Sequence, residues 1–109
     1  MAALAVGDVA LAKYPFTDLS DVKLRPVFVA AVDRDDFLFC MITSQPHNDN
    51  TAIKIPDGDI ASSNLYKVSW VRPRRVFTGN ISIIQKKLGH VSPEFAKVIK
   101  ETIAAWVSS

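Results

Sequence analysis

The sequence predicts a mainly β domain of the α+β class, in which a small, strongly bent β-barrel is closed by one C-terminal helix. Two observations support this prediction. Through most of the chain, short segments rich in apolar and β-branched residues alternate with clusters of turn-forming residues, as expected of strands. From Ser92 onward the apolar residues instead recur at the spacing of an amphipathic helix.

Three strands are predicted in the first half of the chain: "DVALA" (8–12), "PVFVAAV" (26–32) and "FLFCMIT" (37–43). The second and third are almost wholly apolar, so both of their faces should be buried. The polar stretch "DRDD" between them predicts a tight turn and therefore an antiparallel hairpin.

The second half of the chain predicts shorter strands and two loops. The strands are expected over residues 51–55, 66–71 and 83–91. The stretches "QPHNDN" and "PDGD" are dense in turn-forming residues and are expected to be loops.

The C-terminal segment predicts a helix over residues 93 to about 107. Ser92 can cap the helix, Pro93 suits its first position, and Glu94 complements the positive charge of its N-terminus. Together with the strands, this helix gives an SH3-like barrel. The expected apolar face, which should pack on the sheet or on a second subunit, consists of Phe95, Val98, Ile99, Ile103 and Trp106.

The composition is that of one folded domain spanning residues 1–109. Hydrophobic residues make up 49% and charged residues 22%, enough apolar material to form a core. Cys40 is the only cysteine, so no disulfide or cysteine metal site can form within one chain. The N-terminus lacks the basic start of a secretory signal, and no apolar stretch is long enough to span a membrane. We therefore expect a cytoplasmic protein.

The charges are distributed unevenly along the chain. Residues 60–93 contain six basic residues and no acidic one, whereas residues 1–59 contain nine aspartates and five basic residues. This asymmetry is compatible with a polyanion or an acidic partner, and equally with a solvated face that binds nothing.

A charged residue stands at the start of the predicted strand over residues 26–32. Pro26 favours extended geometry at Arg25 and suits a strand entrance or a sheet edge, so Arg25 is expected at the rim of the barrel. Two interpretations remain open. Arg25 pairs with Asp18 or Asp21 of the preceding loop, or its planar, permanently charged guanidinium binds a phosphate.

Hydroxyl and amide groups follow the predicted strand over residues 37–43, in "ITSQP". Thr43, Ser44 and Gln45 would lie at the mouth of the barrel, although residues of this kind more often cap turns. In the predicted hairpin, Arg25 begins one strand and Thr43 ends its neighbour. Both residues should therefore lie on the same rim.

Two histidines and one basic segment complete the candidates. His47 follows the hydroxyl cluster, and a histidine can transfer protons near neutral pH, although an exposed loop histidine without a role is commoner. His90 is expected to be structural. The segment "VSWVRPRRVFTG" interleaves aromatic and basic residues, as suits base stacking and phosphate binding, or else forms a strand with a basic edge. No metal-site spacing is present, and the buried Cys40 is a poor nucleophile.

Four segments, in this order and spacing, resemble the MazF/PemK/Kid family of toxins from bacterial toxin–antitoxin pairs. They are "GDVALAKYPFTDLSDVKLRPVFV", "MITSQ", "VSWVRPRRVFT" and "KKLGHVSPEFAKVI". The resemblance spans residues 7–106. It implies an SH3-like barrel, a homodimer, and an endoribonuclease that cuts single-stranded RNA at a short sequence without a metal or other cofactor. It also implies an inhibitory antitoxin with an acidic tail.

The resemblance also assigns residues. The family's catalytic arginine falls on Arg25 and its catalytic threonine on Thr43, and we add His47 as a candidate for proton transfer. In one place the sequence departs from the family, because Arg74 stands where many relatives carry an acidic residue, so the proton acceptor is not identified. The expected RNA-binding residues are Lys23, Ser44, Gln45, Trp70, Arg72, Arg74 and Arg75.

Two other functions remain compatible with the sequence. One is a CcdB-like toxin of the same fold, which poisons DNA gyrase by binding and has no enzymatic activity. It would not need Arg25 and Thr43 on one rim, and its function would concentrate in the C-terminal helix. The other is an SH3-like module that binds a peptide or nucleic acid without cutting it.

Overall fold

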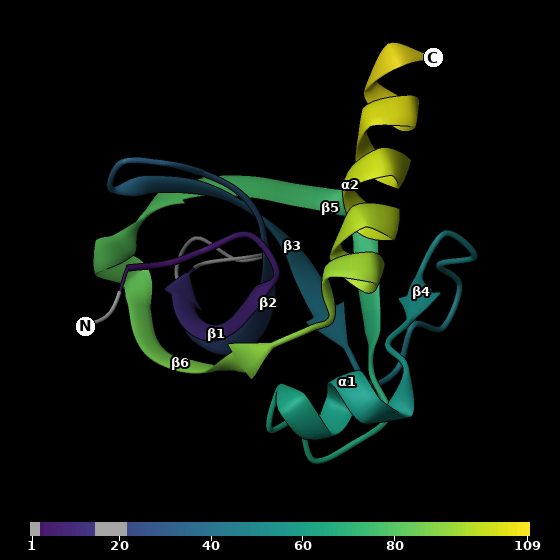
Figure 1. The fold of residues 1–109 in the computed structure, drawn as a ribbon, viewed down its shortest axis with the longest axis horizontal. Coiled ribbons are helices and arrows are strands. Elements are labelled where there is room, and N and C mark those ends of the chain that lie inside the picture. Colours follow the sequence, from purple (N-terminus) through teal and green to yellow (C-terminus); the bar gives the residue numbers. More distant parts are fainter. Residues whose placement is uncertain (1–2, 15–21) are drawn as a thin grey trace.

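A computed structural model describes residues 3–14 and 22–109. They form a six-stranded antiparallel sheet in the order β4-β5-β3-β2-β1-β6, with a long C-terminal helix (Figure 1). The strands are β1 (Asp8–Tyr14), β2 (Lys23–Asp33), β3 (Asp36–Thr43), β4 (Ile53–Lys54), β5 (Trp70–Asn80) and β6 (Ile84–His90). The helices are α1 (Asp57–Ser62), the 3₁₀ turn η1 (Ile81–Ile83) and α2 (Pro93–Ser108).

The strongly bent sheet and the C-terminal helix confirm the predicted mainly β fold (Figure 1). The predicted barrel is incomplete in one respect. In the described part of the chain, β4 and β6 are the edges of the sheet and are not hydrogen-bonded to each other, so the sheet stays open. The strand order nevertheless brings the first and last strands together, because β1 pairs with β6 as well as with β2.

The middle strands have buried residues on both faces, as their apolar sequences predict. In β2 the side chains of Val27 and Val29 belong to one buried cluster, and those of Phe28 and Ala30 belong to the other. This alternation is the two-residue period of a strand with a core on either side. Beyond Ala30 the strand leaves the core, and Val32 is exposed.

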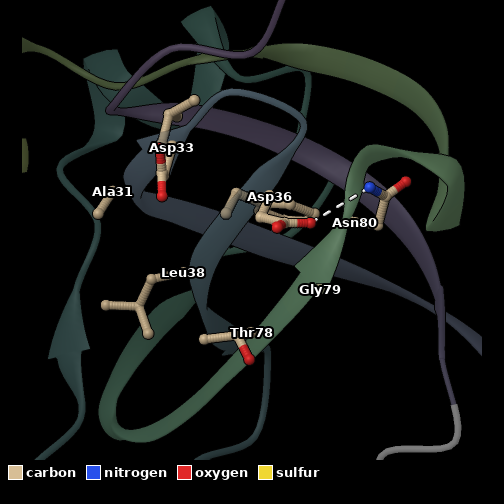
Figure 2. Close-up of a pocket in the computed structure, with 9 residues that line it drawn as sticks. Ala31, Asp33, Asp36, Leu38, Thr78, Gly79 and Asn80 are labelled. Atoms are coloured by element: carbon tan, nitrogen blue, oxygen red, sulfur yellow. Dashed lines mark hydrogen bonds between the residues drawn. The ribbon is translucent and has the colours of Figure 1, made fainter.

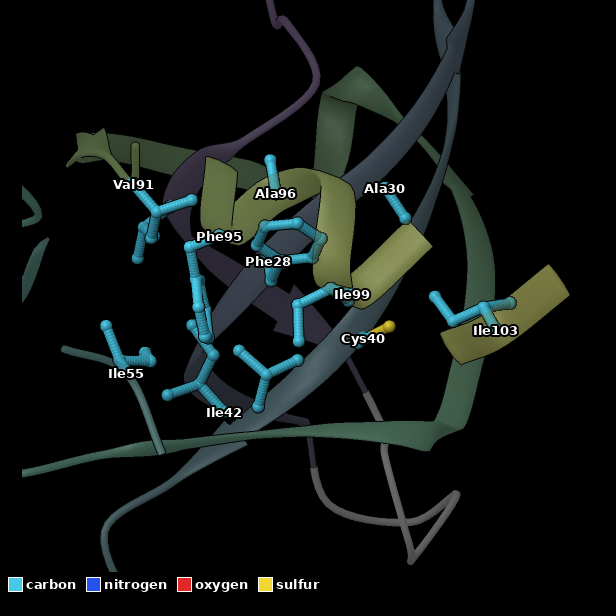
Figure 3. Close-up of a cluster of buried hydrophobic side chains, with 12 residues drawn as sticks. Phe28, Ala30, Cys40, Ile42, Ile55, Val91, Phe95, Ala96, Ile99 and Ile103 are labelled. Carbon is cyan, nitrogen blue, oxygen red and sulfur yellow. The ribbon is translucent and has the colours of Figure 1, made fainter. Parts of the chain in front are cut away.

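The larger cluster lies between the sheet and α2 (Figure 3). Phe28 and Cys40 contribute from the sheet, and Phe95 and Ile99 contribute from the helix. Burial raises the pKa of the Cys40 thiol to about 12. Cys40 is therefore protonated at neutral pH and acts as a small apolar residue in the core.

Helix α2 begins as its sequence predicts, since the Ser92 hydroxyl accepts a hydrogen bond from the Phe95 N–H at 3.2 Å. Its apolar face is narrower than expected. Val98 is 48% exposed and Trp106 is 36% exposed, because the sheet covers only the stripe centred on Ile99. The buried residues of the helix are Phe95, Ala96, Ile99 and Ile103.

The prediction of a loop at "PDGD" is wrong, because helix α1 covers Asp57–Ser62. Asp57 and Asp59 lie in its first turn, where negative charge favours a helix. The C-terminal end of α1 packs closely against β6 at Gly89, where only a glycine fits. A Cβ on Gly89 would lie 2.2 Å from the Ser62 carbonyl oxygen.

The strand predicted over residues 66–71 is also displaced, because β5 begins at Trp70 and continues to Asn80. Pro73 lies inside it and cannot donate a ladder hydrogen bond. The β3–β5 register accommodates the proline by a bulge, since Cys40 pairs with Val76 and the next residue, Met41, pairs with Arg72. The strands predicted over residues 51–55 and 83–91 are confirmed in shorter form as β4 and β6.

Candidate functional site

The β2–β3 hairpin brings Arg25 and Thr43 to the same end of the sheet. Its turn is the predicted tight one at Arg34 and Asp35, and its ladder pairs Val27 with Met41. From this pair, Arg25 lies two residues back along β2 and Thr43 two residues on along β3, so both lie at the same end of the hairpin. Both side chains line a groove of about 570 Å³, which we call the strand-end groove.

Six of the ten predicted site residues line the strand-end groove: Arg25, Thr43, Ser44, Gln45, His47 and Arg72. Arg74 and Arg75 line an adjoining groove of about 460 Å³, which we call the loop groove. The two grooves share Gln45, His47 and Arg72. Lys23 and Trp70 are not among the residues that line either groove.

Arg25 lies exposed on β2. Among residues 3–14 and 22–109 it forms no ion pair. Asp18 and Asp21, the alternative partners that the sequence offers, lie outside the described residues. Within the described part of the chain, the guanidinium is therefore available to a ligand in the strand-end groove.

The Thr43 hydroxyl has the turn-capping role that is common at strand ends. Its oxygen accepts a hydrogen bond from the Gln45 N–H at 3.1 Å and donates to the Gln45 carbonyl at 3.3 Å. This local bonding holds the side chain in one orientation while it lines the groove. If this hydroxyl gives up its hydrogen bond to the Gln45 carbonyl, it and the Arg25 guanidinium can donate to two oxygens of one phosphate.

His47 lies where the strand-end groove meets the loop groove, and its side chain is exposed. Its backbone has a φ of 44°, in the left-handed region that non-glycine residues seldom adopt. Strained conformations of this kind cluster at functional sites.

An ion pair between Asp49 and Arg72 forms part of the groove wall, and sequence analysis did not find it. Arg72 Nε lies 2.7 Å from Asp49 Oδ2, and the Asp49 side chain is only 11% exposed. Burial alone would raise the pKa of Asp49. Hydrogen bonds from the Thr51 hydroxyl, Arg72 and the Thr51 N–H, together with the Arg72 charge, lower it to about 2.

The lowered pKa of Asp49 predicts an acid-dependent loss of stability. An unfolded aspartate has a pKa of about 3.9, so the native state binds fewer protons than the unfolded state between the two values. The contribution is complete above about pH 5 and is lost as the pH falls through about 4 toward about 2. We expect the stability difference between the natural protein and Asp49→Asn to shrink across this range, as measured by urea unfolding at a series of pH values.

The Asn variant keeps the shape of Asp49 and one acceptor oxygen but has no carboxyl group to protonate. Its free energy of unfolding should therefore lack the pH dependence that Asp49 contributes. Asp57→Asn, in the first turn of α1, provides a control with the same loss of charge. A difference between natural protein and Asp49→Asn that stays constant from pH 6 to pH 3 would contradict the assigned ion pair.

Arg74 is held by a contact that the sequence did not predict. Its guanidinium carbon lies 5.2 Å from the centre of the Trp106 ring, within the range of a cation–π interaction. Trp106 belongs to the last turns of α2, so this contact joins the basic edge of β5 to the helix.

The groove residues that sequence analysis did not name as site residues include Asp49, Tyr66 and Lys67. Tyr66 is fully exposed, at 102% of its reference accessibility. An acidic residue in the loop "QPHNDN" gave no sign of pairing with Arg72, 23 positions away. Only the fold brings the two together.

A separate hollow, of about 540 Å³, lies at the opposite end of the hairpin (Figure 2). Asp33 and Asp36 line it, and Asp36 accepts a hydrogen bond from the Asn80 amide at 3.2 Å. None of the described residues that line this hollow is basic. Its charge is therefore unsuited to a polyanion, in contrast to that of the strand-end and loop grooves.

The described residues, 3–14 and 22–109, contain neither a metal-binding cluster nor a membrane-spanning helix. No group of three or more histidine, cysteine, aspartate or glutamate residues within them is arranged to hold a metal ion. No helix within them is both long enough and apolar enough to cross a membrane.

Comparison with known proteins gives a family match and several similar folds. Residues 5–107 match the family model of the PemK-like, MazF-like toxin of type II toxin–antitoxin systems. A chain of the MazE–MazF structure (Form II) from Deinococcus radiodurans has a TM-score of 0.73 and 10% identity, covering 98% of this chain and 97% of that chain. No curated protein sequence matches the chain.

Two mycobacterial structures are also similar. An endoribonuclease in complex with its cognate antitoxin, from a mycobacterial species, has a TM-score of 0.71 and 17% identity, covering 99% of this chain and 96% of that chain. The Mycobacterium tuberculosis toxin MazF-mt6 has a TM-score of 0.70 and 16% identity, covering 93% and 96%. At these identities the structural matches show a common fold.

Proposed function

The chain belongs to the PemK-like, MazF-like toxin family of type II toxin–antitoxin systems, and on this basis we propose that it is a metal-independent endoribonuclease that cuts single-stranded messenger RNA at a short sequence. The observation that carries the proposal is the strand-end groove, where Arg25, Thr43 and His47 surround one space. Among the similar folds, one is named an endoribonuclease and was solved with its antitoxin.

The proposed reaction uses the substrate's own 2′-hydroxyl. Its oxygen forms a bond to the adjacent phosphorus, the bond from phosphorus to the 5′-oxygen breaks, and the products carry a 2′,3′-cyclic phosphate and a 5′-hydroxyl. One proton leaves the 2′-oxygen and another reaches the departing 5′-oxygen. The protein must stabilise the negative charge that grows on the phosphate oxygens while these protons move.

Arg25 is the residue proposed to stabilise this charge. Its exposed guanidinium has no ion-pair partner among the described residues, and it presents several N–H donors on a rigid strand. An arginine side chain keeps its proton at neutral pH, so it serves as a donor of hydrogen bonds and not as a base.

Thr43 and His47 complete the proposed catalytic set. The Thr43 hydroxyl would orient the scissile phosphate by exchanging its hydrogen bond to the Gln45 carbonyl for one to a phosphate oxygen, and the His47 imidazole would accept or donate a proton. Asp49 is unsuited to the role of base, because its pKa of about 2 leaves it with little affinity for a proton. Its proposed function is to hold Arg72 in place.

The loop groove extends the proposed RNA site. Arg74 and Arg75 line it beside Arg72, and Ser44 and Gln45 add polar groups at the junction of the two grooves. The same basic surface would attract the acidic tail of an inhibitory antitoxin. We further propose a homodimer that acts in the cytoplasm, with the exposed Val98 and Val107 of α2 available for subunit contact.

The decisive experiment incubates the purified protein with a long RNA in the presence of EDTA and maps the ends. We expect cuts at a recurrent short sequence. The new 5′ ends should accept labelled phosphate from polynucleotide kinase without prior phosphatase treatment, and the new 3′ ends should resist polyadenylation until their phosphate is removed.

An Arg25→Ala preparation purified in the same way controls for contaminating ribonuclease. Loss of cutting in EDTA, or 5′-phosphate ends, would overturn the proposed chemistry. RNA binding without cutting would favour a non-catalytic SH3-like module. Growth arrest with neither RNA binding nor cutting would favour a gyrase-binding toxin of the CcdB type.

A further inference from the structure

We infer that the RNA site continues beyond the strand-end groove, across the ring of Tyr66, into a third groove beside β6. This inference rests on the proposed RNA cleavage and adds to it a base-stacking residue and a second phosphate contact. The third groove, which we call the β6 groove, has a volume of about 480 Å³ and is lined in part by Lys86 and Lys87.

The three grooves form one continuous path because neighbouring grooves share walls. The loop groove and the strand-end groove have Gln45, His47 and Arg72 in common. The strand-end groove and the β6 groove have Leu65 and Tyr66 in common. A chain that enters beside Arg74 can therefore pass Arg25 and reach β6 without leaving the surface.

Tyr66 stands on the boundary between the strand-end groove and the β6 groove. Its side chain is fully exposed, so packing against the core does not explain an aromatic residue there. A flat, exposed ring between two open grooves suits the face of an unpaired base, which would otherwise remain unstacked in a single strand. In duplex RNA the base faces are already stacked on one another, so Tyr66 would favour single-stranded RNA.

The chain on either side of Tyr66 is held by hydrogen bonds. The Asn64 amide donates a hydrogen bond to the Leu88 carbonyl, and the Ser63 hydroxyl donates to the His90 carbonyl at 3.2 Å. After Tyr66, the Ser69 carbonyl accepts from the Ile55 N–H at 2.9 Å. These bonds place the exposed ring on a braced segment, which reduces the entropy lost when a base stacks on it.

The charges along this path favour a phosphate backbone. Lys67 lines the strand-end groove, and Lys86 and Lys87 line the β6 groove. Lys87 is paired with Asp8 at 3.0 Å, whereas Lys86 is exposed and forms no ion pair within residues 3–14 and 22–109. Lys86 is therefore the cation that would contact a phosphate beyond the stacked base.

The test measures binding to a mixed-sequence 2′-O-methyl RNA oligonucleotide, which cannot be cut because the attacking hydroxyl is blocked. We expect Tyr66→Ala to weaken binding by roughly 5- to 100-fold, as loss of one stacked base predicts. Tyr66→Phe keeps an aromatic ring, so its affinity should lie within about twofold of that of the natural protein. Lys86→Gln should lower the slope of log affinity against log salt by about 0.7. Lys100→Gln, an exposed lysine of α2 away from the three grooves, should leave the slope unchanged.

The same variants are then compared in the cleavage of a long natural RNA. Tyr66→Ala should change the base preferred at a position next to the cut, while Tyr66→Phe should keep it. If the natural protein cuts RNA and Tyr66→Ala binds and cuts with unchanged affinity and preference, this inference is overturned and the proposed function stands. If the natural protein neither binds nor cuts RNA, both are overturned.

Discussion

Replacement of Arg25 by alanine is expected to reduce the rate of RNA cleavage by roughly 10²- to 10³-fold, the usual effect of removing one donor from a site of developing charge. The fold should survive, because Arg25 is exposed and has no ion-pair partner among the described residues. Its loss should change the free energy of unfolding by no more than about 0.5 kcal/mol, as is usual for surface substitutions. Single-turnover cleavage and urea unfolding measure the two effects separately.

Two further variants separate the contributions of Arg25. Arg25→Lys keeps the charge but loses the planar fork of donors, so its rate should lie between those of the natural protein and Arg25→Ala. Arg34→Asn removes a guanidinium from the hairpin turn at the opposite end of the sheet, where asparagine tolerates the φ of 57°. It should cut RNA at the natural rate. Full cleavage or full toxicity in Arg25→Ala would refute the ribonuclease assignment.

Replacement of Gly89 by alanine is expected to have the largest effect on stability. The added methyl group would lie 2.2 Å from the Ser62 carbonyl oxygen and 2.9 Å from the Ser63 Cα, and both are backbone atoms. Helix α1 must therefore move away from β6, at a cost of about 1 to 3 kcal/mol or more. The shift would also strain the Ser63 and Asn64 hydrogen bonds to β6. Urea unfolding measures the change in the free energy of unfolding. A loss of affinity for 2′-O-methyl RNA would report the displacement of Tyr66, which follows α1 in the chain.

Gly58→Ala provides the matched control, because Gly58 lies within α1 and a Cβ there meets nothing within 4 Å. Alanine favours a helix more than glycine does, so this variant should gain about 0.4 to 1 kcal/mol. If Gly89→Ala and Gly58→Ala changed stability in the same direction and by the same amount, the close contact between α1 and β6 would be excluded.

The parts of the fold that could be predicted from sequence are those specified by local patterns. The β2–β3 hairpin follows from two apolar runs around a tight polar turn, and α2 follows from its cap at Ser92 and its period. The shared rim of Arg25 and Thr43 follows from the hairpin register. Each of these features depends on residues close together in the chain.

The features that sequence analysis missed depend on distant partners. Helix α1 looks like a loop until β6, with Gly89, provides the surface on which it packs. The pairing of Asp49 with Arg72 requires the loop after β3 to fold back over β5. The high β propensity of Tyr66 predicts a strand there, whereas in the structure it is fully exposed and follows a segment that is hydrogen-bonded to β6.

The pairing of β1 with β6 determines when the molecule can be completed. Asp8 lies opposite His90, so this pairing joins two strands that are far apart in the sequence. During synthesis from the N-terminus, β1 therefore keeps one bare edge until β6 has been made, and the apolar stripe of α2 reaches the larger core later still. The complete fold, and any activity that depends on it, thus arises only after β6 and α2 have been made. A chain interrupted before β6 would contain Arg25 and Thr43 without the sheet that holds them.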